Sequence, residues 1–279
     1  MSFRAFLALT RRELLRWVRT PAAIISSLMM PFFYLLLFGQ ALNLGKIIAA
    51  EPIPAAQVAV FFQGAPNFYS YFSAGMVGFV VLFTSLFAGA NLIFDKRLGF
   101  VKRVAAAPVS RSVILGSRLA AGVLRGVLLG IAVFAIAVLF AHLPGLAGLT
   151  VSGSPGVVGI AEIFLAMVFL AAAFTSIFLA LGFVIEKVDS YFAVMNLVNL
   201  PLLFSSNALF PRYLMPTWLQ DLSNWNPVSL AVDVIRENLF GSSAYYPYSA
   251  AEYLGFLFVI AAVLVGASVL ITQRTLSAK

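Results

Sequence analysis

Long apolar runs, separated by short polar stretches, dominate the pattern of positions along this chain. A helix that crosses a bilayer needs about 20 mostly apolar residues, and six runs reach that length. The runs are too long for the strands of a membrane barrel and do not alternate with a period of two. We therefore predict an all-α integral membrane protein, one transmembrane domain over residues 1–279, with six transmembrane helices at 22–44, 69–94, 113–142, 157–185, 191–210 and 253–272.

The composition supports a membrane-embedded chain. Hydrophobic residues make up 62% of it and charged residues 10%, against about 25% charged residues in soluble domains. The mean hydropathy is +1.01, so much of the apolar surface has to face lipid. The net charge of +8 fits basic loops beside anionic headgroups better than a nucleic-acid site. We expect membrane lipids, and no nucleic acid, as partners.

The placement of lysine and arginine predicts the orientation of the chain. Basic residues precede the first run, fill the segment 95–112 and follow the sixth run, whereas the alternate loops hold few. Short loops rich in lysine and arginine stay in the cytoplasm. We expect a multi-pass protein of the cell (inner or plasma) membrane, with both termini and segment 95–112 on the cytoplasmic side.

The first 20 residues form a basic amphipathic pattern. Phe3, Phe6, Leu7 and Trp17 recur at helical spacing, and arginines cover much of the remaining surface. This pattern predicts an N-terminal amphipathic helix that lies flat at the membrane interface. Two interpretations stay open: an anchor that sets the topology, or a lever that a cytoplasmic partner pushes.

Segment 95–112 is the most basic stretch between two spans. Asp95 to Ala106 can form a short helix, Pro108 ends it because proline lacks an amide hydrogen, and Ser110 can cap the next helix. This pattern predicts a rigid helix-turn-helix below the membrane that transmits force to the spans. The alternative is a plain loop that only satisfies the charge rule.

Segment 211–250 is the longest stretch outside the spans. Pro216 and Pro227 suit first helical positions, Asn226 suits a cap and Gly241 suits a helix end. Each predicted helix is too short to span a membrane and too apolar for an exposed loop. We predict two short re-entrant helices between the fifth and sixth spans, with tryptophans and tyrosines at the interface.

Two of these segments carry recognisable motifs. The first is Asp95-Lys-Arg-Leu-Gly followed by Ala107-Pro-Val-Ser-Arg111, and the second is Pro216…Leu219-Gln220…Leu222…Asn226-Pro227…Arg236. With these motifs, nearly the whole chain resembles the ABC-2-type permeases, the membrane subunits of ATP-binding-cassette exporters. Many members carry a glutamate-rich stretch where Lys96 to Lys102 stand here, so a salt bridge of the family is expected to be absent or reversed.

The resemblance implies a permease subunit of an ATP-driven exporter, which moves an amphipathic, lipid-linked or polysaccharide substrate outward from the cytoplasm or inner leaflet. It implies a second permease copy, as a homodimer or a heterodimer with a related permease, and two copies of a cytoplasmic ABC ATPase that binds ATP and Mg. The N-terminal helix and segment 95–112 would dock on the ATPase through Arg11, Arg12, Arg16, Lys96, Arg97, Lys102, Arg103, Pro108 and Arg111. The two outer helices would form a gate with Pro216, Trp218, Trp225, Pro227 and Arg236.

Motifs for chemistry on the chain itself are missing. No G-x-x-x-x-G-K-[ST] occurs, His142 is the single histidine and there is no cysteine. We expect no catalytic, cofactor or metal site and no ATP hydrolysis on this chain. Acids are scarce inside the spans, which disfavours ion-coupled transport. Two alternatives to a permease stay open: a membrane-embedded lipid-modifying enzyme and a non-transporting assembly scaffold.

A substrate path between two copies would use the second and fifth spans. Hydrogen bonding between helices is an equal use for the asparagines there. On the third span, three glycines predict a ridge for close packing, and Arg125 lies within it; the sequence leaves open whether Arg125 is functional or reaches back to the cytoplasm. The candidate lining comprises Phe79, Phe83, Phe87, Asn91, Asn196, Asn199, Phe204 and Asn207, and the ridge comprises Gly122, Gly126 and Gly130.

Overall fold

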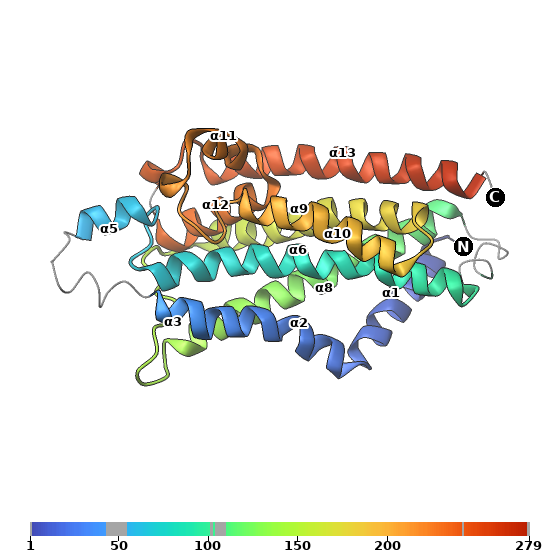
Figure 1. The fold of residues 1–279 in the computed structure, drawn as a ribbon, viewed down its shortest axis with the longest axis horizontal. Coiled ribbons are helices and arrows are strands. Elements are labelled where there is room, and N and C mark those ends of the chain that lie inside the picture. The colour runs from blue at the N-terminus through green and yellow to red at the C-terminus, as the bar shows by residue number, and fades with distance from the viewer. Residues whose placement is uncertain (1, 43–54, 101–102, 104–109, 242, 278–279) are drawn as a thin grey trace.

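The computed structural model describes residues 2–42, 55–100, 103, 110–241 and 243–277. Every element in these ranges is a helix, and no strand occurs among them. The long helices run side by side as an elongated bundle, with the N and C termini at the same end (Figure 1). The predicted all-helical fold class is confirmed.

Five helical segments of the described chain are long and apolar enough to cross a membrane. The first consists of α2 (Pro21–Phe33), the π-helical η1 (Tyr34–Phe38) and α3 (Gly39–Ala41), and the others are α6 (Phe68–Arg97), α8 (Arg111–Phe140), α9 (Val157–Val184) and α13 (Ala250–Ser277). They match the first, second, third, fourth and sixth predicted spans. The shorter elements are α1 (Ser2–Val18), α5 (Ala55–Phe61), α10 (Val188–Phe204), η2 (Arg212–Leu214), α11 (Thr217–Trp225), α12 (Pro227–Phe240) and η3 (Ser243–Tyr245).

The predicted fifth span, 191–210, is the exception. The helix there, α10, has 17 residues and is therefore about 25 Å long at 1.5 Å per residue, against about 30 Å for a hydrocarbon core. Residues 205–210 form turns instead of continuing the helix. The structure shows five long spans and one shorter apolar helix, so the count of six is not confirmed.

The ends of the two outer helices follow the sequence signals closely. The Asn226 side chain accepts a hydrogen bond at 2.9 Å from the amide two residues on, Pro227 opens α12, and Gly241 closes it in the left-handed conformation with φ of 68°. Pro216 lies one residue before α11 rather than at its first position. Both predicted helices exist, and their re-entrant position in a membrane stays a prediction.

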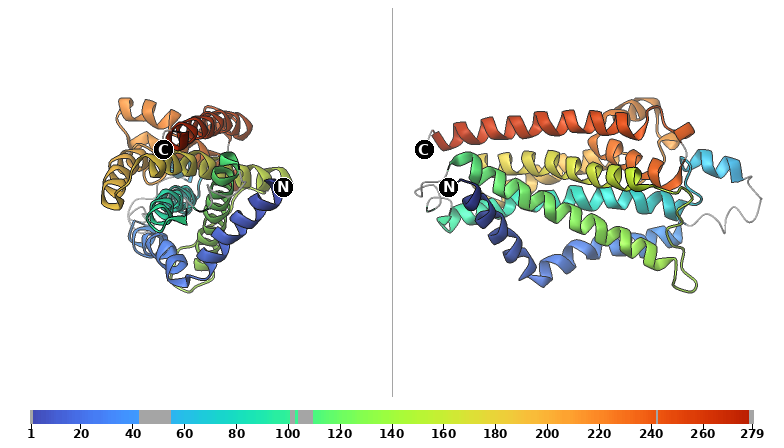
Figure 2. Two further views of the ribbon diagram at one scale, coloured as in Figure 1. Left: turned by 90° about the vertical axis from the view of Figure 1, so that its right-hand side faces the viewer. Right: turned by 180° about the vertical axis from the view of Figure 1, so that it is seen from behind.

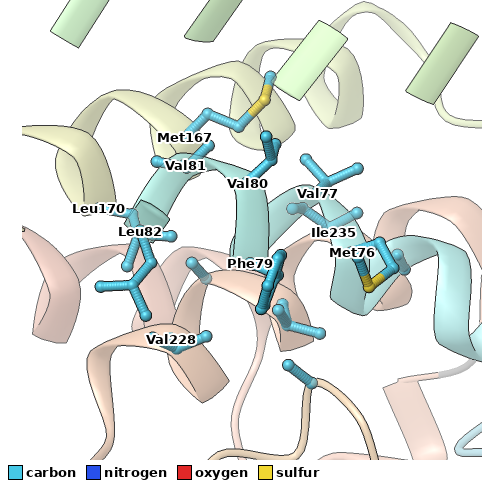
Figure 3. Packing of buried hydrophobic residues seen from close by; sticks show 14 of the residues in the cluster. Met76, Val77, Phe79, Val80, Val81, Leu82, Met167, Leu170, Val228 and Ile235 are labelled. Atoms are coloured by element: carbon cyan, nitrogen blue, oxygen red, sulfur yellow. The ribbon is translucent and has the colours of Figure 1, made fainter. Parts of the chain in front are cut away.

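The core of the bundle forms around α6, whose side chains are mostly buried. In Figure 3, labelled residues of α6 lie between Met167 of α9 and Val228 of α12. α12 is thus inside the bundle, in contact with α6, α9 and α13. α11 lies at the periphery, where Trp218 and Trp225 are exposed. A helix too short to span therefore contributes to the core like a spanning one.

The glycine ridge predicted on α8 is confirmed as a packing surface. A Cβ atom at Gly122 or Gly130 would collide with a side chain of α9, and one at Gly126 would crowd another. Small residues at these positions let the two helix backbones approach closely. The side chains that they meet are Thr175, Met167 and Ala171.

Helix α1 packs against the first turns of α8 and is part of the bundle (Figure 2). Phe6 lies beside Gly116, and the Thr10 hydroxyl donates a hydrogen bond to the Ser117 carbonyl at 3.4 Å. Phe3, on the same predicted apolar face, is exposed. Part of this face is therefore used for packing within the chain, while the predicted position flat on a membrane stays a prediction.

Candidate functional site

The ends of α1, α6 and α8 lie together at the end of the bundle that carries both termini (Figure 2). Charged side chains of these three helices pair there. Asp95, in the last turn of α6, accepts hydrogen bonds from Arg118 Nη2 at 2.5 Å and from Arg16 Nη1 at 2.8 Å. Arg12 Nη1 lies 3.7 Å from the same carboxylate. Glu13 pairs with Arg12 at 2.8 Å and with Arg118 at 3.8 Å. We call these five residues the Asp95 cluster.

Three members of the Asp95 cluster are buried, while Arg12 and Arg16 reach it from the protein surface. Asp95 is 1% exposed, and Glu13 and Arg118 are each 5% exposed. Buried charges are tolerated only when they are paired and hydrogen-bonded, so the ion pairs fix where α1 sits against α6 and α8. The cluster makes the ends of three helices one rigid unit.

The two acids that organise this unit are not evident in the sequence pattern. The sequence predicts Arg12 and Arg16 on a docking face and no role for Glu13 and Asp95 in it, whereas the structure turns both arginines toward Asp95. The sequence signal that could have found these acids is their rarity. The chain has 10 acidic residues in all, and these two lie among cations. An ion pair is therefore present where segment 95–112 begins, and its acid comes from the end of α6.

Lys96 points away from the Asp95 cluster and caps α9. Its Nζ donates hydrogen bonds to the carbonyls of Gly182 at 3.0 Å, Phe183 at 2.9 Å and Ile185 at 3.3 Å. A cation at a helix C-terminus satisfies the last carbonyls and complements the helix dipole. Lys96 thus joins α6 to the turn between α9 and α10, a role that the sequence analysis did not foresee.

Replacing Lys96 with methionine is expected to lower the free energy of unfolding by about 1.5–3 kcal/mol, the usual contribution of a hydrogen bond to a charged group. The apparent melting temperature of the detergent-solubilised protein should fall by about 3 °C or more. The matched control is Arg97→Met at the next, exposed position, which should melt like the wild type. Equal melting of both variants would show that the cap contributes nothing measurable.

The remaining docking candidates are placed only in part. Arg11, Arg97 and Arg103 are exposed, as a docking role requires. Lys102 and Pro108 lie outside the described residues, and Arg111 opens α8 without a described side chain. Segment 95–112 starts as the end of α6, and its helix-turn-helix stays a prediction. Ser110 occupies the predicted cap position but makes no capping bond through its side chain.

A second polar cluster is buried at the opposite end of the bundle. Arg236 of α12 is fully buried and donates hydrogen bonds to the carbonyls of Tyr71 and Asn207, both at 3.0 Å. Its guanidinium also lies over the Tyr71 ring, 3.4 Å from the centroid. Asp233 accepts hydrogen bonds from Asn207 Nδ2 at 2.6 Å and from Arg212 Nη2 at 2.8 Å. We call these five residues the Arg236 cluster.

The Arg236 cluster ties α12 to α6 and to the turns after α10. A neighbouring phenol adds to it: burial raises the pKa of Tyr246 well above its usual range, so the hydroxyl stays protonated and donates to the Gln63 carbonyl at 2.8 Å. Of the other predicted gate residues, Pro227 opens α12, and Pro216, Trp218 and Trp225 lie at α11, apart from the cluster. Their action as a gate stays a prediction.

The predicted path residues on α6 fall into two hollows. Phe79, Phe83 and Phe87 line an apolar groove of about 230 Å³ between α2 and α6. Asn91 lines a separate cavity nearer the Asp95 cluster. The three phenylalanines therefore share one groove between the first and second spans, and their role in a path between two copies stays a prediction.

The predicted path residues on α10 and after it do not join that groove. Asn199 is 2% exposed, and Asn207 is fully buried within the Arg236 cluster. Asn196 and Phe204 are exposed on α10. For Asn207 the alternative use, hydrogen bonding within the protein, is what the structure shows.

The described residues contain no group of histidine, cysteine, aspartate and glutamate side chains that could hold a metal ion. What they do contain is a bundle of long apolar helices, braced at each end by buried charges and hollowed along its side. This arrangement defines a multi-pass, all-helical membrane protein.

The chain belongs to the ABC-2 type transporter family, whose profile matches residues 4–240. It is 31% identical over 231 residues to a protein of Porphyra purpurea named as a transport permease, ycf38, covering 82% of this chain and 72% of that one. It is 24% identical over 236 residues to the daunorubicin resistance ABC transporter permease protein DrrB1 of Streptomyces coeruleorubidus, covering 84% and 75%. Members of this family are transport components and not themselves catalytic, and membership implies an ABC ATPase partner.

Proposed function

We propose that the chain is the permease subunit of an ATP-driven exporter. Two permease copies form the path, two cytoplasmic ABC ATPase subunits bind ATP and Mg, and an amphipathic, lipid-linked or polysaccharide substrate moves outward. In this proposal α10 with its following turns is a sixth crossing, and both termini are cytoplasmic. The positive-inside distribution of lysine and arginine supports that orientation.

The observation that carries the proposal is the Asp95 cluster. A partner can drive a membrane protein from outside only if force applied at the surface reaches the spans without being absorbed by a flexible loop. The pairs of Asp95 with Arg16 and Arg118 join α1, α6 and α8 at their ends. The exposed Arg97 follows two residues later. A partner that binds Arg97 and Arg103 therefore acts directly on a rigid three-helix unit.

The other end of the bundle supports an exit that opens and closes. α12 is buried against three long helices and held by the Arg236 cluster, while α11 is peripheral and joined to α12 at Asn226. Movement of the long helices is thus transmitted to α12, with α11 moving beside it. The apolar groove at Phe79, Phe83 and Phe87 favours a substrate with a hydrophobic part.

Charge reversal of the exposed docking arginines tests this function. The double variant Arg97→Glu/Arg103→Glu, co-expressed with the ABC ATPase, should lose most copurification of the ATPase and most stimulation of its activity by the permease, with an unchanged melting temperature. The control Asp221→Lys reverses one charge on exposed α11 and should behave like the wild type. Unchanged copurification, activity and transport in the double variant would favour a scaffold, and lipid modification by the isolated chain would favour an enzyme.

A further inference from the structure

A cavity of about 170 Å³ that is lined by several polar and charged side chains lies where α1 meets α2, against α6 and α8. It shares Glu13 and Arg16 with the Asp95 cluster. Several of its side chains carry charge or hydrogen-bonding groups. The lining comprises Glu13, Arg16, Trp17, Thr20, Ala23, Asn91 and Arg125.

Arg125 is the unusual member of this lining. It is 7% exposed, and its Nε donates to the Ala121 carbonyl of its own helix at 3.2 Å. No carboxylate of the described chain lies within ion-pair distance of it, and Glu13, the acid whose charge acts on it, already pairs with Arg12 and Arg118. Arg125 lines the cavity.

Arg125 has no counter-charge of its own beside the cavity. The buried acids Glu13 and Asp95 already pair with Arg118 and with the more exposed Arg12 and Arg16. A buried positive charge without a counter-charge is costly, and within a span such a residue marks a functional site.

The hydrogen-bonding groups that line the cavity suit an oxyanion. Guanidinium groups bind phosphate and carboxylate through paired hydrogen bonds. The Asn91 amide makes no hydrogen bond with any described residue and lines the same cavity as Arg125 and Arg16. A volume of 170 Å³ corresponds to about six water molecules at ~30 Å³ each, which is enough for a tetrahedral anion and a water.

The apolar groove begins where this cavity ends. On α2 the cavity reaches Ala23 and the groove begins at Ser26, and on α6 the cavity reaches Asn91 and the groove begins at Phe87, about one helical turn further in each case. The groove holds about 230 Å³ and is lined by Met30, Pro31, Phe79 and Phe83 among others. Headgroup and hydrocarbon sites are therefore aligned along one helix pair.

We propose that the cavity binds the phosphate headgroup of an anionic amphiphile from the inner leaflet, with the hydrocarbon part in the groove between α2 and α6. Together with the proposed export function, on which this point rests, the site identifies the substrate class of the exporter as anionic amphiphiles with a phosphate headgroup. Arg125 supplies the buried positive charge, and Asn91 and Arg16 complete the polar contacts with the phosphate. Phe83 and Phe87 contact the hydrocarbon part of the ligand.

Trp17 lines the cavity and gives a direct readout. The full chain with Trp218→Phe and Trp225→Phe keeps it as the single tryptophan, because the sequence has 3. The purified protein is titrated in a detergent micelle, without ATPase, with dioctanoyl phosphatidic acid, dioctanoyl phosphatidylcholine and inorganic phosphate. We expect a saturable change in Trp17 fluorescence with phosphatidic acid, and binding of the other two at least about tenfold weaker, or 1.4 kcal/mol.

Substitutions in the cavity and in the groove separate binding of the headgroup from binding of the hydrocarbon part. Arg125→Gln should weaken phosphatidic acid binding about tenfold or more, Arg125→Lys should keep most of it, and exposed Arg4→Gln should leave it unchanged. Phe83→Ala should weaken the binding of phosphatidic acid but not the binding of inorganic phosphate. Asn91→Leu, expected to weaken phosphatidic acid binding about threefold or more, serves as the second headgroup variant if Arg125→Gln does not fold.

Three results would overturn the site: equal binding by Arg125→Gln when that variant is folded, phosphatidylcholine binding as tightly as phosphatidic acid, or phosphate binding as tightly with no effect of Phe83→Ala. Binding is measured without the partner, so it is independent of transport. A complex that binds phosphatidic acid through Arg125 but exports nothing would leave the site standing and refute the exporter.

Discussion

Replacing Arg236 with glutamine is expected to destabilise the protein more than any other single change at that end of the bundle. The two hydrogen bonds of 3.0 Å that its guanidinium donates contribute about 1.5–3 kcal/mol each, so the expected loss is about 3–6 kcal/mol. The apparent melting temperature of the detergent-solubilised chain should fall by about 6 °C or more, and the yield in the membrane fraction should fall with it.

Two further variants show whether geometry or charge matters at this position. Arg236→Lys keeps the charge but loses the planar fork that reaches two carbonyls at once, so its melting temperature should lie between those of the wild type and Arg236→Gln. Exposed Arg4→Gln controls for the loss of a cation and should melt like the wild type. A melting temperature for Arg236→Gln within 1–2 °C (roughly the precision of such a comparison) of the wild type would contradict the clamp.

Replacing Asp95 with asparagine is expected to release α1 from the bundle. The change leaves the buried Arg118 guanidinium without its 2.5 Å partner and removes the acid that holds Arg16. Removing one member of a buried pair costs about 3–5 kcal/mol, because the remaining charge is uncompensated. ATPase stimulation by the permease should fall with it, since α1 and α6 no longer move together.

A disulfide reports directly on the contact between α1 and α8. The chain has no cysteine, and the Thr10 hydroxyl lies 3.4 Å from the Ser117 carbonyl, so Thr10→Cys/Ser117→Cys introduces one cysteine on each helix. Mild oxidation should crosslink this pair in the wild-type background and much less with Asp95→Asn. The control Asp221→Asn, the same change at an exposed site, should not reduce crosslinking; full crosslinking with Asp95→Asn would refute the release.

A double-mutant cycle tests the pairing itself. The double variant Arg118→Gln/Asp95→Asn should lose less unfolding free energy than the sum of the losses in the two single variants. The difference should be about 1 kcal/mol or more, because the two side chains are in contact. Additive losses would mean that each residue acts alone.

How much of this fold can be predicted from the sequence depends on whether local or long-range interactions determine each element. Apolar runs of about 20 residues predict spans because only a helix satisfies its backbone in lipid, and local signals at Asn226, Pro227 and Gly241 placed α12 to the residue. α10 was overestimated, since an apolar composition continues past Phe204 although the chain turns there. Nothing local distinguishes an apolar turn packed inside a bundle from another turn of helix.

The charged sites were harder to predict because their partners are far apart in the sequence. Arg16 and Asp95 are paired at 2.8 Å, and Arg236 bonds the Tyr71 carbonyl; no spacing rule links positions so distant. Lys96 counted as one cation among several, and its neighbours in sequence give no hint that it caps α9. Only the packing of the spans decides which cations face a partner protein and which face the chain itself.

Adjacent residues at the end of α6 place a limit on how this protein can evolve. Asp95 reaches α1 and α8, while Lys96 reaches the end of α9. Because each helical residue turns the next by about 100°, one codon inserted or deleted just before them would aim both side chains at the wrong helices. Length variation among relatives should therefore spare the last turns of α6.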